Sequence, residues 1–271
     1  MAAGFHGALA NARWAGHLGR MAHFAFQHLR STPNIGDRVA TPARWLDFGG
    51  QVSVQDLGEE FPACDVAVLG GGQVYGEVAR AVLYHSAAAR RRVVWGVGML
   101  GVNRDTARHD ILAGAVDLMG CRDLGVPGTI HVPCASCMAS RLTKPPPPRH
   151  AVVIYAHATK SAGLARPPGI PHATNHQGSF AQAIDFIASG ETVVSNSYHG
   201  TYWAMLMGRR VLCLPYGAKF GGFSQPPEMA DAADWRAALP RAHVADGYLE
   251  QCRSLTRSFH ARVMDLAEAG G

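Results

Sequence analysis

The stretch TVVSNSYHG at residues 192–200 decides the fold class, and RVLCLPY at residues 210–216 supports it about one helix later. In the first, a β-branched run stops at a Ser, and a His-Gly pair then opens an apolar helical segment. In a parallel α/β sheet, strand C-termini and the following helix N-termini are where ligands bind and anions are stabilised. His199 is therefore predicted at a strand-to-helix corner, and an enzyme is the leading interpretation. The simpler alternative is a His that caps or packs against a helix start.

The rest of the chain repeats this alternation of short apolar runs and helical segments. Runs that do not alternate polar and apolar residues are typical of strands buried on both faces of a parallel sheet. Such runs lie at residues 23–26, 65–69, 92–96, 151–155, 191–195 and 211–215. Helical patterns lie at residues 77–90, at 180–189 with Ser179 as N-cap, and at 249–266, where the apolar face needs a docking surface. A doubly wound α/β fold is predicted.

A run of prolines marks the clearest boundary. The sequence KPPPPR at residues 144–149 cannot lie inside a helix or a central strand and forms a stiff spacer. Two Rossmann-like α/β halves facing a cleft are therefore predicted, at residues 1–144 and 150–271. Residues 1–20 are an extension of the first half, to which no function is given. Clefts between such halves are common ligand sites.

Composition narrows the class of protein. With 48% hydrophobic and 17% charged residues, the 271-residue chain is expected to be compact and globular. The net charge of +5 favours an anionic ligand, but the Arg and Lys residues are scattered, so no nucleic-acid partner is predicted. The six cysteines form no dense framework, and a cytoplasmic protein is the default. Cys134 and Cys137 have C-x2-C spacing without a second pair, so a loop with two thiols is favoured over a zinc or redox site, and no metal is predicted.

Polar and glycine-rich segments follow the predicted strands. In Asn34-Ile35-Gly36-Asp37, the Gly permits a tight turn, and Asn34 and Asp37 could bond a ligand hydroxyl or cap a helix. Gly70-Gly71-Gly72 and Gly96-Val97-Gly98 could form an open floor for an anionic ligand, or only sharp turns, and neither is a dinucleotide or phosphate-loop fingerprint.

Two cationic residues follow other predicted strands or apolar segments. Arg122, in the pair Arg122-Asp123, suits a carboxylate or phosphate because its planar fork bonds two oxygens, although such a pair is more often a surface ion pair. Lys219, after Tyr216, could add a second cation to the same cleft, or be an ordinary solvated Lys.

Taken together, these motifs resemble the polysaccharide pyruvyltransferase family. The shared order is N-x-G-D, D-x-x-x-x-G-G-G, G-x-G, R-D, S-x-x-x-H-G and P-x-x-x-K, found here at residues 34–37, 65–72, 96–98, 122–123, 195–200 and 215–219. The resemblance implies an arrangement like that of GT-B glycosyltransferases, with the first half on the acceptor side and the second on the donor side. It also implies transfer of pyruvate from phosphoenolpyruvate to two hydroxyls of a sugar in a bacterial glycan, as a cyclic ketal. Many members carry Arg where this chain has Ser197, so one anion contact is expected to be missing or to be supplied by Arg122 or Lys219.

The implied chemistry assigns roles to the strand-end residues. His199 is predicted as the general acid that protonates the phosphoenolpyruvate methylene, a task suited to an ordinary pKa near 6.5. Arg122 would hold donor anions and Asp37 would orient or deprotonate the acceptor hydroxyl. The predicted substrate-binding residues are Asn34, Gly36, Gly71, Gly72, Gly98, Ser195, Ser197, Tyr198, Tyr216 and Lys219.

The expected partners are phosphoenolpyruvate, as donor substrate rather than cofactor, and a glycan or lipid-linked sugar acceptor. A lipid-linked acceptor would bring the protein to the inner face of the membrane. Two alternatives stay open, a GT-B-like glycosyltransferase that uses a nucleotide-sugar and a non-catalytic glycan-binding relative.

Overall fold

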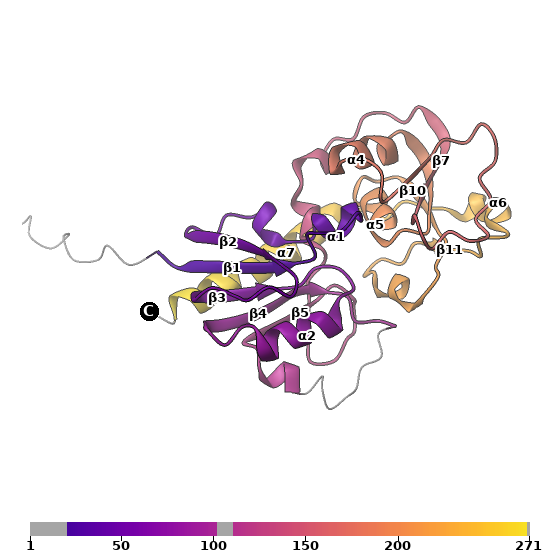
Figure 1. Cartoon of the computed structure of the whole chain (residues 1–271). Helices are drawn as coiled ribbons and strands as arrows, with labels where there is room; N and C mark the ends of the chain where they lie inside the picture. Colours follow the sequence, from indigo (N-terminus) through magenta and orange to yellow (C-terminus); the bar gives the residue numbers. More distant parts are fainter. Residues whose placement is uncertain (1–20, 102–110, 270–271) are drawn as a thin grey trace, which may run out of the picture.

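The computed structural model describes residues 21–101 and 111–269, and it contains one parallel β-sheet on each side of the proline run (Figure 1). The predicted extension at residues 1–20 lies outside the described residues. The first sheet has the order β2-β1-β3-β4-β5-β6 and the second β8-β7-β9-β10-β11. The first sheet consists of β1 (His23–His28), β2 (Gln51–Asp56), β3 (Cys64–Leu69), β4 (Ala89–Val97), β5 (Leu118–Cys121) and β6 (Ile130–His131). The second consists of β7 (His150–Ala156), β8 (His172–Thr174), β9 (Gly190–Ser195), β10 (Arg210–Cys213) and β11 (Glu228–Met229).

Both sheets are wound in the same way. In each, the second strand lies on one side of the first, and the later strands extend from its other side, all in parallel. The strand order therefore reverses between β1 and β3 in one half and between β7 and β9 in the other. Such switch points open a crevice at the strand C-termini, where ligands of doubly wound folds bind. The predicted α/β fold of two Rossmann-like halves facing a cleft is confirmed.

The helices are mostly short, apart from the last one. They include α1 (Ile35–Arg38), α2 (Tyr75–Tyr84), α4 (Phe180–Ala188), α5 (Tyr198–Leu206), α6 (Trp235–Ala238) and α7 (Tyr248–Glu268). Residues 111–114 are helical as well. Single turns of 3-10 helix are found at Pro42–Arg44, Ala135–Met138, Ser140–Leu142, Ala218–Gly222 and Leu239–Arg241. None of the helices in the described ranges is long and apolar enough to cross a lipid bilayer.

Two helix predictions meet different outcomes. The predicted N-cap Ser179 is confirmed, because it forms a capping box with Gln182 at the start of α4. The helix predicted at residues 77–90 ends at Tyr84, and Ala89 already pairs with Cys64 in the sheet. The alanine-rich end of that segment favours a helix locally, but pairing with β3 overrides this preference.

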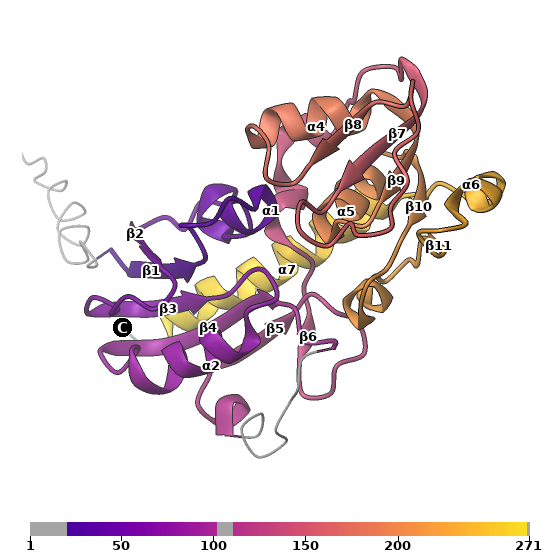
Figure 2. The ribbon, with the colours of Figure 1, turned by 45° about the vertical axis from the view of Figure 1, so that its right-hand side comes forward.

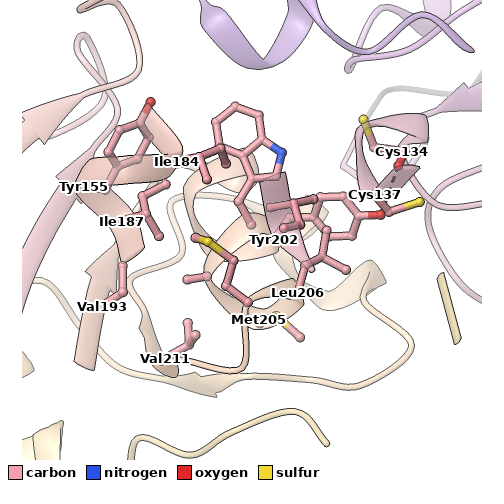
Figure 3. Packing of buried hydrophobic residues seen from close by; sticks show 14 of the residues in the cluster. Cys134, Cys137, Tyr155, Ile184, Ile187, Val193, Tyr202, Met205, Leu206 and Val211 are labelled. Atoms are coloured by element: carbon pink, nitrogen blue, oxygen red, sulfur yellow. Dashed lines mark hydrogen bonds between the residues drawn. The ribbon is translucent and has the colours of Figure 1, made fainter. Parts of the chain in front are cut away.

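The core of the second half is built around α5. All residues of this helix are buried, so it has no solvent face. Its Tyr202, Met205 and Leu206 pack in one cluster with side chains of α4 and of the sheet (Figure 3). The neighbours drawn there include Ile184, Ile187, Val193 and Val211. A helix buried on every side is rigidly held, which fixes the position of its N-terminus.

Helix α7 crosses from one half to the other (Figure 2). Near its start, Tyr248 and Cys252 belong to the cluster around α5. Near its end, Phe259 and Val263 pack under the first sheet, and the Phe259 ring lies 4.8 Å from the ring of Trp95. The predicted docking surface of this helix therefore consists of two surfaces, one on each half.

We predict that Phe259→Ala lowers the free energy of unfolding by about 3–5 kcal/mol, as expected for loss of a buried aromatic ring. Urea denaturation followed by circular dichroism measures this change. The matched control is Ser258→Ala on the exposed face of the same helix, which should shift the value by about 0.5 kcal/mol or less. Equal effects of the two substitutions would show that α7 does not pack on the first sheet.

Candidate active site

A pocket of about 300 Å³ lies where the C-terminal ends of the two sheets meet. Its lining comes from the segments that follow both switch points and the strands beside them. The lining residues are Leu29, Asn34, Asp37, Gln73, Val74, Arg122, His157, Lys160, Asn175, Ser197, Tyr198, His199, Tyr216 and Lys219. Segments far apart in sequence thus meet because parallel strands all end at the same edge.

The corner after β9 is held by its own polar side chains. The Ser195 hydroxyl donates to the Tyr155 carbonyl at 2.7 Å and accepts from the Ser197 N–H at 3.1 Å. The Ser197 hydroxyl in turn caps α5 by accepting from the Gly200 N–H at 3.3 Å. A Cβ on Gly200 would lie 2.4 Å from the Tyr155 ring. The turn, the cap and the close approach together leave His199 at the pocket wall.

His199 is buried and held from the opposite half of the molecule. A Cβ on Gly36 would lie 2.0 Å from its Nδ1, so α1 packs directly against the imidazole. Its Nε2 has no hydrogen-bond partner among the described residues. Burial, with Arg122 and Lys219 nearby, lowers the pKa of His199 well below 6.5. This differs from the ordinary pKa expected from the sequence, and His199 is neutral at pH 7 while the pocket holds no anion.

Arg122 is a buried cation at the same wall. It is 3% exposed, and its guanidinium carbon lies 3.8 Å from the centroid of the Tyr198 ring. Its Nε forms an ion pair with Asp123 Oδ1 at 4.0 Å, beyond hydrogen-bond distance, and neither Nε nor Nη1 has a hydrogen-bond partner among the described residues. The surface location weighed for the Arg122–Asp123 ion pair is wrong, because both side chains are buried. A buried cation with free donors is a site prepared for an anion.

Small residues and a carboxylate position this guanidinium. A Cβ on Gly98 would lie 2.8 Å from Arg122 Nε, so only glycine leaves room there. Asp123 accepts from the Met99 and Leu100 N–H groups at 2.6 and 2.7 Å, which fixes the loop after β4. A Cβ on Gly222 would meet Asp123 Oδ1 at 2.6 Å. The R-D pair thus combines one residue that faces the pocket with one that braces the loop behind it.

Lys219 supplies the second cation. Its ammonium donates to the Tyr216 hydroxyl at 2.6 Å. Burial, and repulsion by Arg122, lower the pKa of Lys219 to about 8. Burial and Lys219 also lower the pKa of His157, to about 4, so this imidazole is neutral. The pocket therefore concentrates positive charge on Arg122 and Lys219.

The opposite wall carries Asp37. Asn34 is the N-cap of α1, and its amide donates to Asp37 Oδ2 at 2.7 Å. Asn175 donates to Asn34 Oδ1 at 3.1 Å, a hydrogen bond between the two halves. Burial raises the pKa of Asp37, although Arg122 and Lys219 oppose the rise. A carboxylate in these surroundings can accept a proton from a hydroxyl held beside it.

The structure brings most of the predicted residues together. The predicted residues that line the pocket are Asn34, Asp37, Arg122, Ser197, Tyr198, His199, Tyr216 and Lys219. The others, Gly36, Gly71, Gly72, Gly98 and Ser195, are absent from its lining. The expected open glycine floor is not formed, because a Cβ on Gly71 would meet Ala40 and one on Gly72 would meet Asp37.

Several lining residues are not identified by the sequence analysis. They are Leu29, Gln73, Val74, His157, Lys160 and Asn175. A usable signal exists for His157, which follows the predicted strand at 151–155 directly, and for Gln73, which follows the glycine run. Asn175 follows the three-residue strand β8, whose short length gives no periodic pattern.

The two cysteines of the C-x2-C pair are absent from the pocket lining. Cys134 and Cys137 are buried free thiols, with Sγ atoms 3.2 Å from Ser136 Oγ and 3.3 Å from Thr256 Oγ1. Within residues 21–101 and 111–269, no group of three or more His, Cys, Asp or Glu side chains could hold a metal ion.

Comparison with known proteins supports the fold. No protein-family model matches the chain, and a search of curated proteins finds no match. The glycotransferase of kitacinnamycin is similar over 93% of this chain and 99% of its own, with 11% identity and a TM-score of 0.50. A protein of uncharacterised function from Klebsiella pneumoniae covers 82% and 90%, with 13% identity and a TM-score of 0.49. A protein assigned as a UDP-N-acetylglucosamine 2-epimerase from Listeria monocytogenes covers 87% and 91%, with 8% identity and a TM-score of 0.47. The likeness to the glycotransferase of kitacinnamycin supports the GT-B-like α/β fold, and at 11% identity it shows the fold alone.

We predict that Gly36→Ala displaces the His199 ring, because the added methyl group would overlap the imidazole. Imidazole resonances assigned with a His199→Gln reference should shift in the NMR spectrum. The matched control is Gly76→Ala, whose Cβ would meet nothing within 4 Å in α2. An unchanged His199 signal in a folded Gly36→Ala protein would contradict the close approach of α1.

Proposed function

We propose that this protein transfers pyruvate from phosphoenolpyruvate to two hydroxyls of a sugar, forming a cyclic ketal. The observation that supports it most is the buried Arg122 guanidinium, whose Nε and Nη1 lack partners, beside Lys219 and His199. Phosphoenolpyruvate carries a carboxylate and a phosphate, which two separate cations can neutralise, and a guanidinium bonds either group through two oxygens. The motif order that resembles the polysaccharide pyruvyltransferases supports the same donor.

Each reaction step then has a residue in the pocket. His199 gives a proton to the methylene carbon of phosphoenolpyruvate, and positive charge develops at C2 as an oxocarbenium ion. A sugar hydroxyl attacks C2, and its proton passes to Asp37. Phosphate leaves with the electron pair of its C–O bond, and Arg122 and Lys219 stabilise its charge. A second hydroxyl then attacks C2 and closes the ring, and its proton passes to the departing phosphate.

The lowered pKa of His199 has a defined role in this scheme. The field of Arg122 and Lys219 contributes to the lowering, and an anionic donor between them cancels that part. The pKa of His199 therefore rises when phosphoenolpyruvate binds, and the imidazole takes up the proton that it later donates. The protonated form of His199 is therefore present only in the complex with phosphoenolpyruvate.

We predict that phosphoenolpyruvate binds with uptake of up to one proton at pH 7. Titration calorimetry in two buffers of different ionisation enthalpy measures this number. His199→Gln should still bind phosphoenolpyruvate but without the uptake, since Lys219 is already mostly protonated at this pH.

Nucleotides provide the comparison for this titration. UDP, GDP and CMP should bind more weakly than phosphoenolpyruvate. Binding of a nucleotide that phosphoenolpyruvate does not displace would replace pyruvyl transfer with nucleotide-sugar glycosyl transfer. Equal proton uptake in the wild type and in His199→Gln would remove His199 from the acid role.

We also predict that phosphoenolpyruvate affinity falls as pH rises through 8, because only protonated Lys219 attracts the anion and its pKa is about 8. Well above that pH this loss adds about a tenfold rise of the dissociation constant per pH unit to the rise that proton uptake by His199 causes. Lys219→Arg should remove the added rise, since a guanidinium stays charged there, and leave only the part that comes from His199. Lys160→Arg, at the same pocket, is the matched control and should keep the wild-type profile. A profile that Lys219→Arg leaves unchanged would exclude Lys219 as the titrating group.

A further inference from the structure

A second pocket, of about 340 Å³, lies beside the segment that connects β1 to α1. Its lining residues are His28, Arg30, Arg38, Thr41, Ala43, Arg44 and Val54. The same segment contributes Leu29, Asn34 and Asp37 to the candidate active site. The two pockets are therefore neighbours that share the segment of residues 28–38.

The second pocket is strongly cationic. Arg30, Arg38 and Arg44 are all exposed, and within the described residues no ion pair joins any of them to a carboxylate. Arg30 Nη1 donates to the Val54 carbonyl at 2.8 Å, which holds its guanidinium against β2. Arg44 lies over the Trp45 ring, 5.1 Å from its centroid. Arg38 Nη2 donates to the Gly178 carbonyl at 3.3 Å. All three guanidinium groups are thus placed by a contact, while most of their N–H donors stay free.

Few negative charges lie near the second pocket to offset its three guanidinium groups. Asp56, at the end of β2, accepts from the backbone N–H groups of Arg30, Ser31 and Leu57. Its carboxylate is therefore satisfied by the backbone and forms no ion pair with the Arg30 guanidinium. One neutralising charge against three cations leaves a net positive pocket.

His28 forms part of the pocket lining. It is only 4% exposed, and its Nδ1 has no hydrogen-bond partner among the described residues. Burial lowers the pKa of His28, and a hydrogen bond to the Arg38 backbone opposes this change. A buried polar atom without a partner is costly unless a ligand or water satisfies it. In neutral His28 the nitrogen without a partner is an acceptor, so the fit to an anion with several acceptor oxygens rests on the arginine side chains of the pocket.

We propose that this second pocket binds a phosphate or pyrophosphate group. Arginine forks match phosphate oxygens through paired N–H donors, and three of them can serve one such group. Because the pockets share one segment, a sugar whose hydroxyls reach Asp37 can place its own phosphate among Arg30, Arg38 and Arg44. That assignment to the acceptor rests on the proposed function, whereas phosphate binding does not. The acceptor is then a phosphorylated sugar, either soluble or linked to a lipid.

Titration calorimetry with inorganic pyrophosphate tests the pocket without any reaction. With phosphoenolpyruvate at saturation, pyrophosphate should still bind, and Arg44→Ala should weaken it by about tenfold or more, as expected for loss of a charged hydrogen-bond donor. The matched control is Arg236→Ala, because Arg236 also lies over a Trp ring, at 5.8 Å, but outside both pockets. Arg236→Ala should bind like the wild type. No pyrophosphate binding, or equal binding by Arg44→Ala and wild type, overturns the proposal.

The two proposals fail separately. In Lys219→Met, phosphoenolpyruvate binding should weaken while pyrophosphate binding persists, and Arg44→Ala should give the reverse pattern. If pyrophosphate binds and phosphoenolpyruvate does not, the phosphate pocket stands and the pyruvyl donor is wrong. Glucose 1-phosphate and phosphatidylcholine vesicles that carry polyprenyl phosphate then distinguish the sources. If either ligand competes with pyrophosphate, the result supports the pocket and identifies a soluble or a lipid-linked phosphate as its ligand. If neither ligand competes, the acceptor assignment is overturned.

Discussion

The burial of one guanidinium constrains the rest of the site. Transfer of an ion from water into a protein interior costs several kcal/mol even after the structure relaxes. Arg122 recovers part of this through the face of Tyr198 and the more distant charge of Asp123, but its Nε and Nη1 find no acceptor in the described protein. Room for the guanidinium requires the absence of a side chain at Gly98. In the proposed function, the phosphoenolpyruvate anion supplies the acceptor oxygens that make this arrangement favourable.

The fold was predictable where burial controls the sequence, and less so at the edges. Each run predicted as a strand overlaps β1, β3, β4, β7, β9 or β10, which all lie inside the two sheets. The interior strand β5 is not predicted as a strand, because it has only four residues. Strand β2 escapes the pattern because it is an edge strand whose exposed and half-buried positions carry polar residues such as Gln51 and Gln55. Strands β8 and β11 have three and two residues, too few for any period. Their positions follow from pairing with neighbours, which a single sequence does not display.

The candidate site was predictable from topology more than from residue type. Polar residues after central strands, such as Asp37, Arg122 and His199, meet because both switch points open toward one pocket. The glycines were interpreted by type, as places where a ligand approaches the backbone. In the structure Gly36 and Gly98 instead admit the side chains of His199 and Arg122. A glycine signals close approach, but the sequence does not tell whether the approaching group is a ligand or the protein itself.

The same charges that attract a donor also control the acid. Burial removes the water that would stabilise an imidazolium, and Arg122 and Lys219 repel a proton from His199, so its pKa is low. In the proposed reaction this prevents His199 from holding a proton before the donor arrives, when that proton would add to the positive charge of Arg122, Lys160 and Lys219. A donor with two anionic groups reverses the local field and makes the protonated form favourable beside the atom that must receive the proton. An uncharged ligand would leave the field intact and His199 neutral, so the pocket couples acid formation to the charge of its substrate.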